Sequence, residues 1–184
     1  MSSFIIILTI DELITYITGP DFPTGGIING KSGIIEAYKT GRGKVRVAGK
    51  IKIEESKNGK ESIIVNELPY QVNKARLIER IAELVRNKKL TGISDLRDES
   101  DRDGIRVVIE LKRGEESELI LNSLYKYTDL QNTFGIIFLA LVDNAPRVLN
   151  LKEILQNYLK HRYSVVIRRT KFELDKVEKR AHIL

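Results

Sequence analysis

The segment from Lys44 to Lys52 alternates basic and apolar residues, and this pattern constrains the fold more than any other in the chain. Successive side chains of a β-strand point to opposite faces of the sheet. One face would therefore carry cations, while the other could pack on a core. The cations are Lys44, Arg46, Lys50 and Lys52, and the apolar residues are Val45, Val47 and Ile51. At strand rise the basic face would extend over about 27 Å, which suits a polyanion.

The net charge of +6 is modest for 184 residues, but it is unevenly distributed. Residues 39–52 contain six basic residues and no acid, residues 160–184 have a net charge of +5, and the rest of the chain has a net charge of −5. Segregated charge creates a local field that the average over the chain conceals. A solvated sheet face whose lysines only maintain solubility would show the same pattern, so both interpretations stay open at this point.

The composition limits the class of protein. A hydrophobic content of 42% is enough for a core. The absence of cysteine excludes disulfides, thiolate metal sites and a cysteine nucleophile. The apolar run over residues 4–8 is too short to cross a bilayer and lacks the features of a signal peptide. We therefore expect a soluble, cytoplasmic protein that does not associate with membranes.

Patterns of helices and strands alternate along the first 150 residues. They predict an α+β fold, mainly an antiparallel sheet with flanking helices. The expected elements are a helix over 11–17, a glycine-punctuated loop over 25–33, a hairpin of strands 44–55 and 61–68 around Asn58-Gly59, a helix from Asn73 to Gly92, a strand over 105–111, a helix over 115–127 with Leu119, Ile120 and Leu124 facing inward, and a buried strand over 134–142.

The C-terminal segment has a continuous helical pattern. Asn150 and Glu153 have the spacing of a capping box, and no glycine or proline interrupts the pattern before Leu184. A helix of that length would measure roughly 50 Å. We expect an α+β domain over residues 1–150 and the start of a long coiled-coil helix over 151–184. A helix that stops in mid-pattern indicates a piece of something larger.

Two other groups of residues could carry chemistry. Tyr38 and Tyr70 lie near basic residues, but packing at a sheet edge is favoured over a nucleophilic role. The acidic residues between Glu99 and Glu110 match a calcium loop only in part, because a strand pattern replaces the second helix. We favour a network in which arginines fix this loop, and surface hydrogen bonding for the two histidines. The arginines are Arg97, Arg102 and Arg106, and the histidines are His161 and His182.

Several longer motifs, which occur in family order from about Ile10 to the end, resemble the A subunits of bacterial DNA gyrase. They are Gly19-Pro-Asp-Phe-Pro-Thr-Gly-Gly26, Tyr38-Lys-Thr-Gly-Arg-Gly-Lys44, Leu68-Pro-Tyr-Gln-Val-Asn-Lys-Ala-Arg76, Asp95-Leu-Arg-Asp-Glu-Ser-Asp-Arg-Asp-Gly104, Phe134-Gly-Ile136, Pro146-Arg-Val-Leu-Asn-Leu-Lys-Glu-Ile154 and Arg180-Ala-His-Ile-Leu184. The A-type subunit of topoisomerase IV is similar too, but the motifs starting at Tyr70 and Leu96 look more like gyrase.

The resemblance implies the tower domain and the first part of the helix that continues into the coiled-coil arm. In that family the DNA-cleaving tyrosine and the isoleucine that wedges into DNA lie upstream, and the gyrase B subunit holds the Mg²⁺ carboxylates and the ATPase. The chain would therefore have no catalytic residue or cofactor of its own. Its partners would be double-stranded DNA, the gyrase B subunit, and a second copy of the A-type chain, in an A2B2 enzyme that negatively supercoils DNA by ATP-dependent strand passage.

The resemblance also selects candidate DNA-binding residues. Arg42 and Lys44 match the family's Gly-Arg-Gly-Lys pattern, and Arg46 and Lys50 lie where the family is often basic. Lys74 and Arg76 are secondary candidates, for which solvation of a helix surface is an equally good interpretation. Phosphate contacts would position a bent duplex without reading its sequence. A brace that only carries the coiled-coil arm is the alternative. An unrelated RNA-binding α+β module is disfavoured, because the sequence lacks the aromatic stacking motif on a strand that such modules use.

Overall fold

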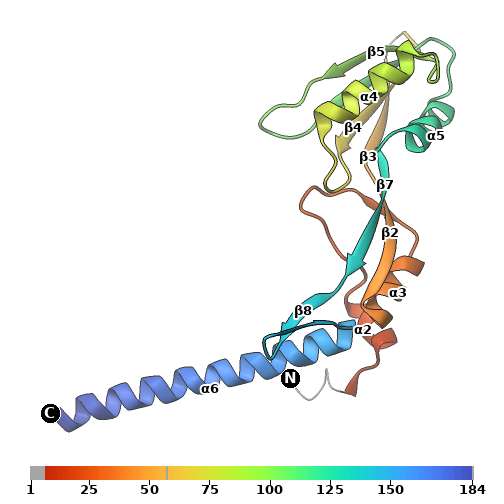
Figure 1. Ribbon diagram of the computed structural model, residues 1–184. Coiled ribbons are helices and arrows are strands. Elements are labelled where there is room, and N and C mark those ends of the chain that lie inside the picture. Colours follow the sequence, from red (N-terminus) through yellow and green to blue (C-terminus); the bar gives the residue numbers. More distant parts are fainter. Residues whose placement is uncertain (1–6, 57, 184) are drawn as a thin grey trace. The chain divides into compact units, whose positions relative to one another are not determined.

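The computed structural model describes residues 7–56 and 58–183, and the chain divides into two compact units (Figure 1). The sheet unit consists of residues 20–32 and 44–134, and the helix unit consists of the remaining described residues. Strands β2 (Arg42–Ala48) and β7 (Gln131–Ile137) contribute residues to both units. Helices combine with antiparallel strands and the chain ends in a long helix, which confirms the predicted α+β class.

The sheet unit contains a four-stranded antiparallel sheet in the order β3-β4-β6-β5 and two helices. A second sheet has the order β1-β2-β7. The elements of this unit besides β2 and β7 are β1 (Ile27–Asn29), β3 (Lys50–Glu55), β4 (Glu61–Glu67), α4 (Lys74–Arg86), β5 (Ile93–Asp98), β6 (Val107–Leu111) and α5 (Ser117–Tyr127). Those of the helix unit are α2 (Ile10–Tyr16), α3 (Ser32–Thr40, apart from its first residue), β8 (Leu139–Val142), β9 (Ala145–Val148) and α6 (Leu151–Ile183).

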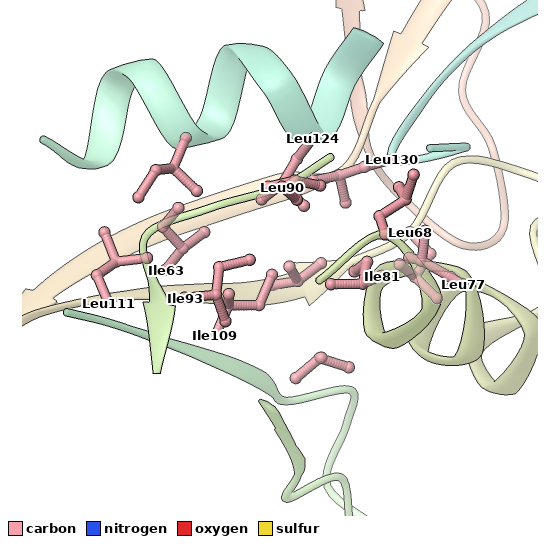
Figure 2. Packing of buried hydrophobic residues seen from close by; sticks show 14 residues of the cluster. Ile63, Leu68, Leu77, Ile81, Leu90, Ile93, Ile109, Leu111, Leu124 and Leu130 are labelled. Atoms are coloured by element: carbon pink, nitrogen blue, oxygen red, sulfur yellow. The ribbon is translucent and has the colours of Figure 1, made fainter. Parts of the chain in front are cut away.

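The core of the sheet unit lies between one face of the four-stranded sheet and the helices α4 and α5 (Figure 2). In the ladder between β4 and β6, Ile63 faces Ile109 and Val65 faces Val107, so these four side chains share the core face. Buried residues of α4 recur at Leu77, Ile81 and Leu84, which is helical spacing. α5 adds Ile120 and Leu124 to the same cluster.

Helix α4 begins where the sequence predicts, because the Asn73 side chain accepts a hydrogen bond of 3.1 Å from the backbone N–H of Arg76. The helix ends at Arg86, however, and the expected end at Gly92 is wrong. Lys88 has a φ of +57°, and the N–H of Leu90 donates to the Leu84 carbonyl. This turn returns Leu90 to the core, which is incompatible with a longer helix.

Three other expectations are wrong. The apolar segment 134–142 is not one buried strand, because it is shared by β7 and β8. β8 pairs with β9 across Asp143-Asn144, where both residues have positive φ, and Leu139 is 63% exposed on that hairpin. Leu119 does not face inward on α5, since it is 64% exposed. The loop expected over 25–33 contains strand β1 and the start of helix α3.

Helix α6 begins with the predicted capping box. Asn150 Oδ1 accepts from the N–H of Glu153 at 2.9 Å, and Glu153 Oε2 accepts from the N–H of Asn150 at 2.8 Å. The boundary expected at residue 150 coincides with this helix start, whereas the compact units divide the chain elsewhere, so the proposed domain limits stay a prediction. Among the described helices, none is both long enough and apolar enough to span a bilayer.

Candidate nucleic-acid interface

Strand β2 presents basic side chains on one face and buries apolar side chains on the other. Lys44 and Arg46 are exposed, whereas Val45 and Val47 are 2% and 1% exposed. In the pairing with β1, Arg46 lies opposite Asn29 and Val47 lies opposite Ile28. The alternation expected from the sequence is therefore present along this strand.

Gly26 approaches the buried side of β2, and an aromatic cluster forms around Phe22 in the same unit. Gly26 has a φ of +95°, and a Cβ at this position would lie 3.2 Å from Val47 Cγ1, so the backbone approaches β2 closely. Phe22 packs against Tyr70 at 5.5 Å and against Phe134 at 5.1 Å between ring centroids. Of these contacts, the approach of Gly26 to Val47 lies on the buried side of β2.

Neither tyrosine considered from the sequence is placed for nucleophilic chemistry. Tyr70 lies in the aromatic cluster just described, which agrees with a packing role. Tyr38 lies on helix α3 rather than at a sheet edge, is 2% exposed and stacks on Phe138 at 5.9 Å. Burial raises the pKa of the Tyr38 phenol, which disfavours its ionised form.

The basic face is not one continuous strand from Lys44 to Lys52, and that prediction is wrong. β2 ends at Ala48 in the sheet β1-β2-β7, and β3 begins at Lys50 in the four-stranded sheet. Between them, the N–H of Gly49 donates to the Leu130 carbonyl at 2.8 Å. A Cβ at Gly49 would lie 2.7 Å from the Glu67 carbonyl oxygen. Only glycine permits this approach, and the chain changes its strand partners here.

Carboxylates engage two of the six candidate residues. Lys50 Nζ lies 3.3 Å from Glu67 Oε1, and Lys74 Nζ lies 2.8 Å from Asp98 Oδ2. The Lys74 ammonium, with hydrogen bonds from Ser100, lowers the pKa of Asp98 to about 2. The remaining candidates are exposed and make no ion pair with the described residues. They are Arg42, Lys44, Arg46 and Arg76.

The candidates also differ in location. Lys44 and Arg46 lie together on β2, with Lys50 following at the start of β3. Lys74 and Arg76 occupy the first turn of α4. Arg42 belongs to the helix unit, whereas the other five belong to the sheet unit. The strand residues and the helix residues therefore lie on separate elements.

Arginines and carboxylates form a network around the segment after β5, as the sequence predicts. Arg97 pairs with Asp95, Glu99 and Glu110 at 2.6, 3.2 and 3.1 Å, respectively. Arg106 pairs with Glu99 at 3.1 Å and with Glu54 at 3.1 Å, and two lysines extend the network by pairing with Glu54 and Glu110. Within the described part of the chain, the network has four cations and four carboxylates. Its cations are Lys52, Lys60, Arg97 and Arg106.

The network keeps its acids ionised. Hydrogen bonds from Arg106 and Arg97 hold the pKa of the Glu99 carboxyl below its usual value, and Arg97 and Lys60 do the same for Glu110. Glu99 and Glu110, the first and last carboxylates of the calcium-loop spacing, therefore pair with guanidinium groups. Arg102, which we also expected in the network, makes no ion pair with the residues that the structure describes.

Sequence reasoning missed two features that shape this surface. Glu67 contacts Lys50 across the ladder of β3 and β4, and nothing in the spacing of 17 residues marks the pair. Gly49 was available as a signal, because glycine within a strand pattern often marks a bulge or a close approach of backbone.

Comparison with known proteins identifies the class to which this arrangement belongs. The family model for the A-type subunits of DNA gyrase and topoisomerase IV matches residues 3–184, so the chain belongs to that family of DNA topoisomerase subunits. Among its relatives, the DNA gyrase A subunit of Aeromonas salmonicida is 65% identical over 179 residues, and that of Clostridium acetobutylicum is 64% identical over 176 residues. Each match covers 96% of this chain but only 19% and 21% of the relative, respectively. The chain thus spans about a fifth of the length of these relatives.

The DNA gyrase A subunit of Pseudomonas aeruginosa is also similar, with 61% identity over 179 residues. These relatives support the resemblance to gyrase A subunits that the sequence motifs indicate. The role of individual residues in binding DNA stays a prediction.

Proposed function

We propose that this chain is the tower segment of a gyrase A subunit, in which the exposed face of β2 holds the phosphate backbone of duplex DNA. One observation carries the proposal: Lys44 and Arg46 are exposed on a strand whose opposite face is buried, and neither pairs with an acid among the described residues. The cations of β2 differ in this respect from those of the charge network on the four-stranded sheet, which pair with carboxylates.

The proposed contacts act through charge rather than through base recognition. Neutralising a phosphate releases counterions, so binding weakens as salt concentration rises. With three to five phosphates engaged, the slope of log K against log salt would be roughly −3 to −4.5. In the intact enzyme, such contacts along the duplex would offset part of the cost of bending DNA, which is several kcal/mol.

At the level of the whole enzyme, the proposal follows from membership of the family. The intact A2B2 protein would negatively supercoil DNA in the cytoplasm by ATP-dependent passage of one duplex through another. The gyrase B subunit would supply the sites for ATP and Mg²⁺, and a second A-type chain would complete the dimer. This chain would be inactive alone, with α6 leading into the coiled-coil arm.

The test is a salt titration of duplex binding with two matched quadruple alanine variants. The first replaces the proposed cations, and the second removes the same charge from exposed residues that make no ion pair with the described chain. The first set is Arg42, Lys44, Arg46 and Lys50, and the second set is Lys89, Arg102, Lys112 and Arg113. The first variant should flatten the salt slope substantially, while the second should leave it close to that of the parent.

Two results would reject the proposal. Equal slopes for the two variants would mean that net charge alone drives binding. No duplex binding by the parent, in isolation or within the full-length A-type chain, would favour the alternative of a structural brace.

A further inference from the structure

Glu67 makes two different contacts with its two carboxylate oxygens. Oε2 accepts a hydrogen bond of 2.6 Å from the backbone N–H of Gly26, and Oε1 lies 3.3 Å from Lys50 Nζ. Gly26 closely approaches Val47, whose side chain is on the buried face of β2. The Glu67 side chain therefore contacts both Gly26, which lies against β2, and Lys50, the first cation after β2.

Two interactions hold Glu67 in place: its pairing with Lys50 in the strand ladder and the hydrogen bond that its side chain accepts from Gly26. Lys50 and Glu67 are directly opposite in the ladder of β3 and β4, and the next pair is Ile51 with Val65, so Asn66 is an extra residue in a bulge. The short bond to Gly26 holds one oxygen in place and is the largest cause of the lowered pKa of the Glu67 carboxyl, which Lys50 lowers further. The carboxylate thus stays charged and stays beside Lys50 at neutral pH.

Lys50 is nevertheless accessible. Its side chain is 59% exposed, compared with 33% for that of Glu67. A phosphate could reach the ammonium group from solvent, but it would have to compete with a carboxylate that cannot easily move away. Lys44 and Arg46 face no such competition among the described residues.

We propose that Glu67 is a positioning residue that restrains Lys50 and so ends the strong part of the phosphate-binding surface at Arg46. This inference rests on the proposed function, since it assigns a regulator to the same site. Lys50 would contribute to binding only after exchanging the carboxylate for a phosphate. Glu67 would therefore limit the affinity of the chain for duplex DNA.

The test is the substitution Glu67→Gln, which removes the charge but keeps an oxygen that can accept from Gly26. An exposed ion pair of this kind corresponds to a factor of about two to five in affinity. We expect duplex affinity to rise by about that factor, and the salt slope to steepen by up to about 0.9 as Lys50 becomes available. Glu55→Gln is the matched control, because Glu55 lies on the same strand as Lys50, is exposed and makes no ion pair with the described residues.

The double variant Lys50→Ala/Glu67→Gln separates this mechanism from a general effect of charge. In the Lys50→Ala background, Glu67→Gln should change affinity no more than Glu55→Gln does. If Glu67→Gln raised duplex affinity equally with and without Lys50, the inference would be overturned. The inference would also be overturned if Glu67→Gln gave no gain although binding by the parent depends on the β2 cations. If binding by the parent did not depend on the β2 cations, the proposed function itself would be rejected.

A measurement without substitution covers the case in which the variant does not fold. Lysines of the parent are acetylated with and without duplex DNA, and the extent of reaction is read for each lysine by mass spectrometry. Without DNA, Lys50 should react more slowly than Lys44, because its side-chain nitrogen lies against the Glu67 carboxylate, whereas Lys44 makes no ion pair with the described residues. Duplex DNA should protect Lys44 more strongly than Lys50. Protection of Lys50 equal to or greater than that of Lys44 would overturn the inference.

Discussion

Replacing Ile81 with alanine tests whether the core of the sheet unit is packed as described. Ile81 is 0% exposed at the centre of α4, within the cluster that joins this helix to β4 and β6. The change removes three buried carbon atoms, which is worth about 2.4 kcal/mol at roughly 0.8 kcal/mol per methylene. The cavity adds about 1 kcal/mol, and the higher helix propensity of alanine returns about 0.4 kcal/mol. The free energy of unfolding should therefore fall by about 3 kcal/mol.

The assay is urea unfolding at pH 7, followed by far-ultraviolet circular dichroism. The midpoint should fall while the dependence of the free energy on urea concentration stays the same, because the surface exposed on unfolding hardly changes. Leu119→Ala is the control, since Leu119 is 64% exposed on α5; its effect should stay within about 0.5 kcal/mol. A loss below about 1 kcal/mol for Ile81→Ala, or equal losses for the two variants, would refute the described packing.

Three further predictions concern local features. Gly49→Ala should destabilise the sheet unit by about 1–3 kcal/mol in urea unfolding, because the new Cβ would lie 2.7 Å from the Glu67 carbonyl oxygen. An unchanged urea midpoint would contradict this close approach. Asn73→Ala should cost about 1 kcal/mol through loss of the cap, while Asn122→Ala on exposed α5 surface should cost less, and equal losses would argue against capping. Lys74 lowers the pKa of Asp98 to about 2, so the stabilising effect of the ionised Asp98 is complete above the unfolded pKa near 3.8 and is lost as pH falls toward 2. Asp98→Asn should therefore make the urea midpoint less sensitive to acid. An identical pH profile for parent and variant would contradict the ion pair.

The elements that the sequence predicted correctly depend on local interactions. Asn73 and Asn150 cap α4 and α6 through side chains only three residues away, so both helix starts follow from short-range spacing. The hairpin of β3 and β4 is also local, and Gly59 in its turn has a φ of +70°. The buried positions of α4 follow from helical periodicity alone.

The features that could not be predicted depend on partners distant in sequence. Strand β5 is an edge strand rich in charge, and its pairing with β6 is what orders it. The chain changes sheets at Gly49 because of the backbones at Glu67 and Leu130. The pairing of Lys50 with Glu67 depends on that change, so the alternating pattern overestimated the length of the basic strand.

Part of the candidate site could still be predicted. The alternation identified the exposed cations of β2 correctly, because burial of Val45 and Val47 dictates which side chains face solvent. The alternation contained no information on which cations are already paired. That distinction separates Lys44 and Arg46 from Lys50 and Lys74.

The most direct test of the account is photocrosslinking from a position that leaves every cation intact. Asn29 is exposed and lies opposite Arg46 in the ladder of β1 and β2, so a benzophenone side chain there would sit beside the proposed phosphate contacts. Asn122 on α5 is exposed and provides the matched control. The account predicts efficient crosslinking of duplex DNA from position 29, suppressed by salt, and little from position 122. Equal yields from the two positions, or a yield from position 29 that salt does not reduce, would contradict it.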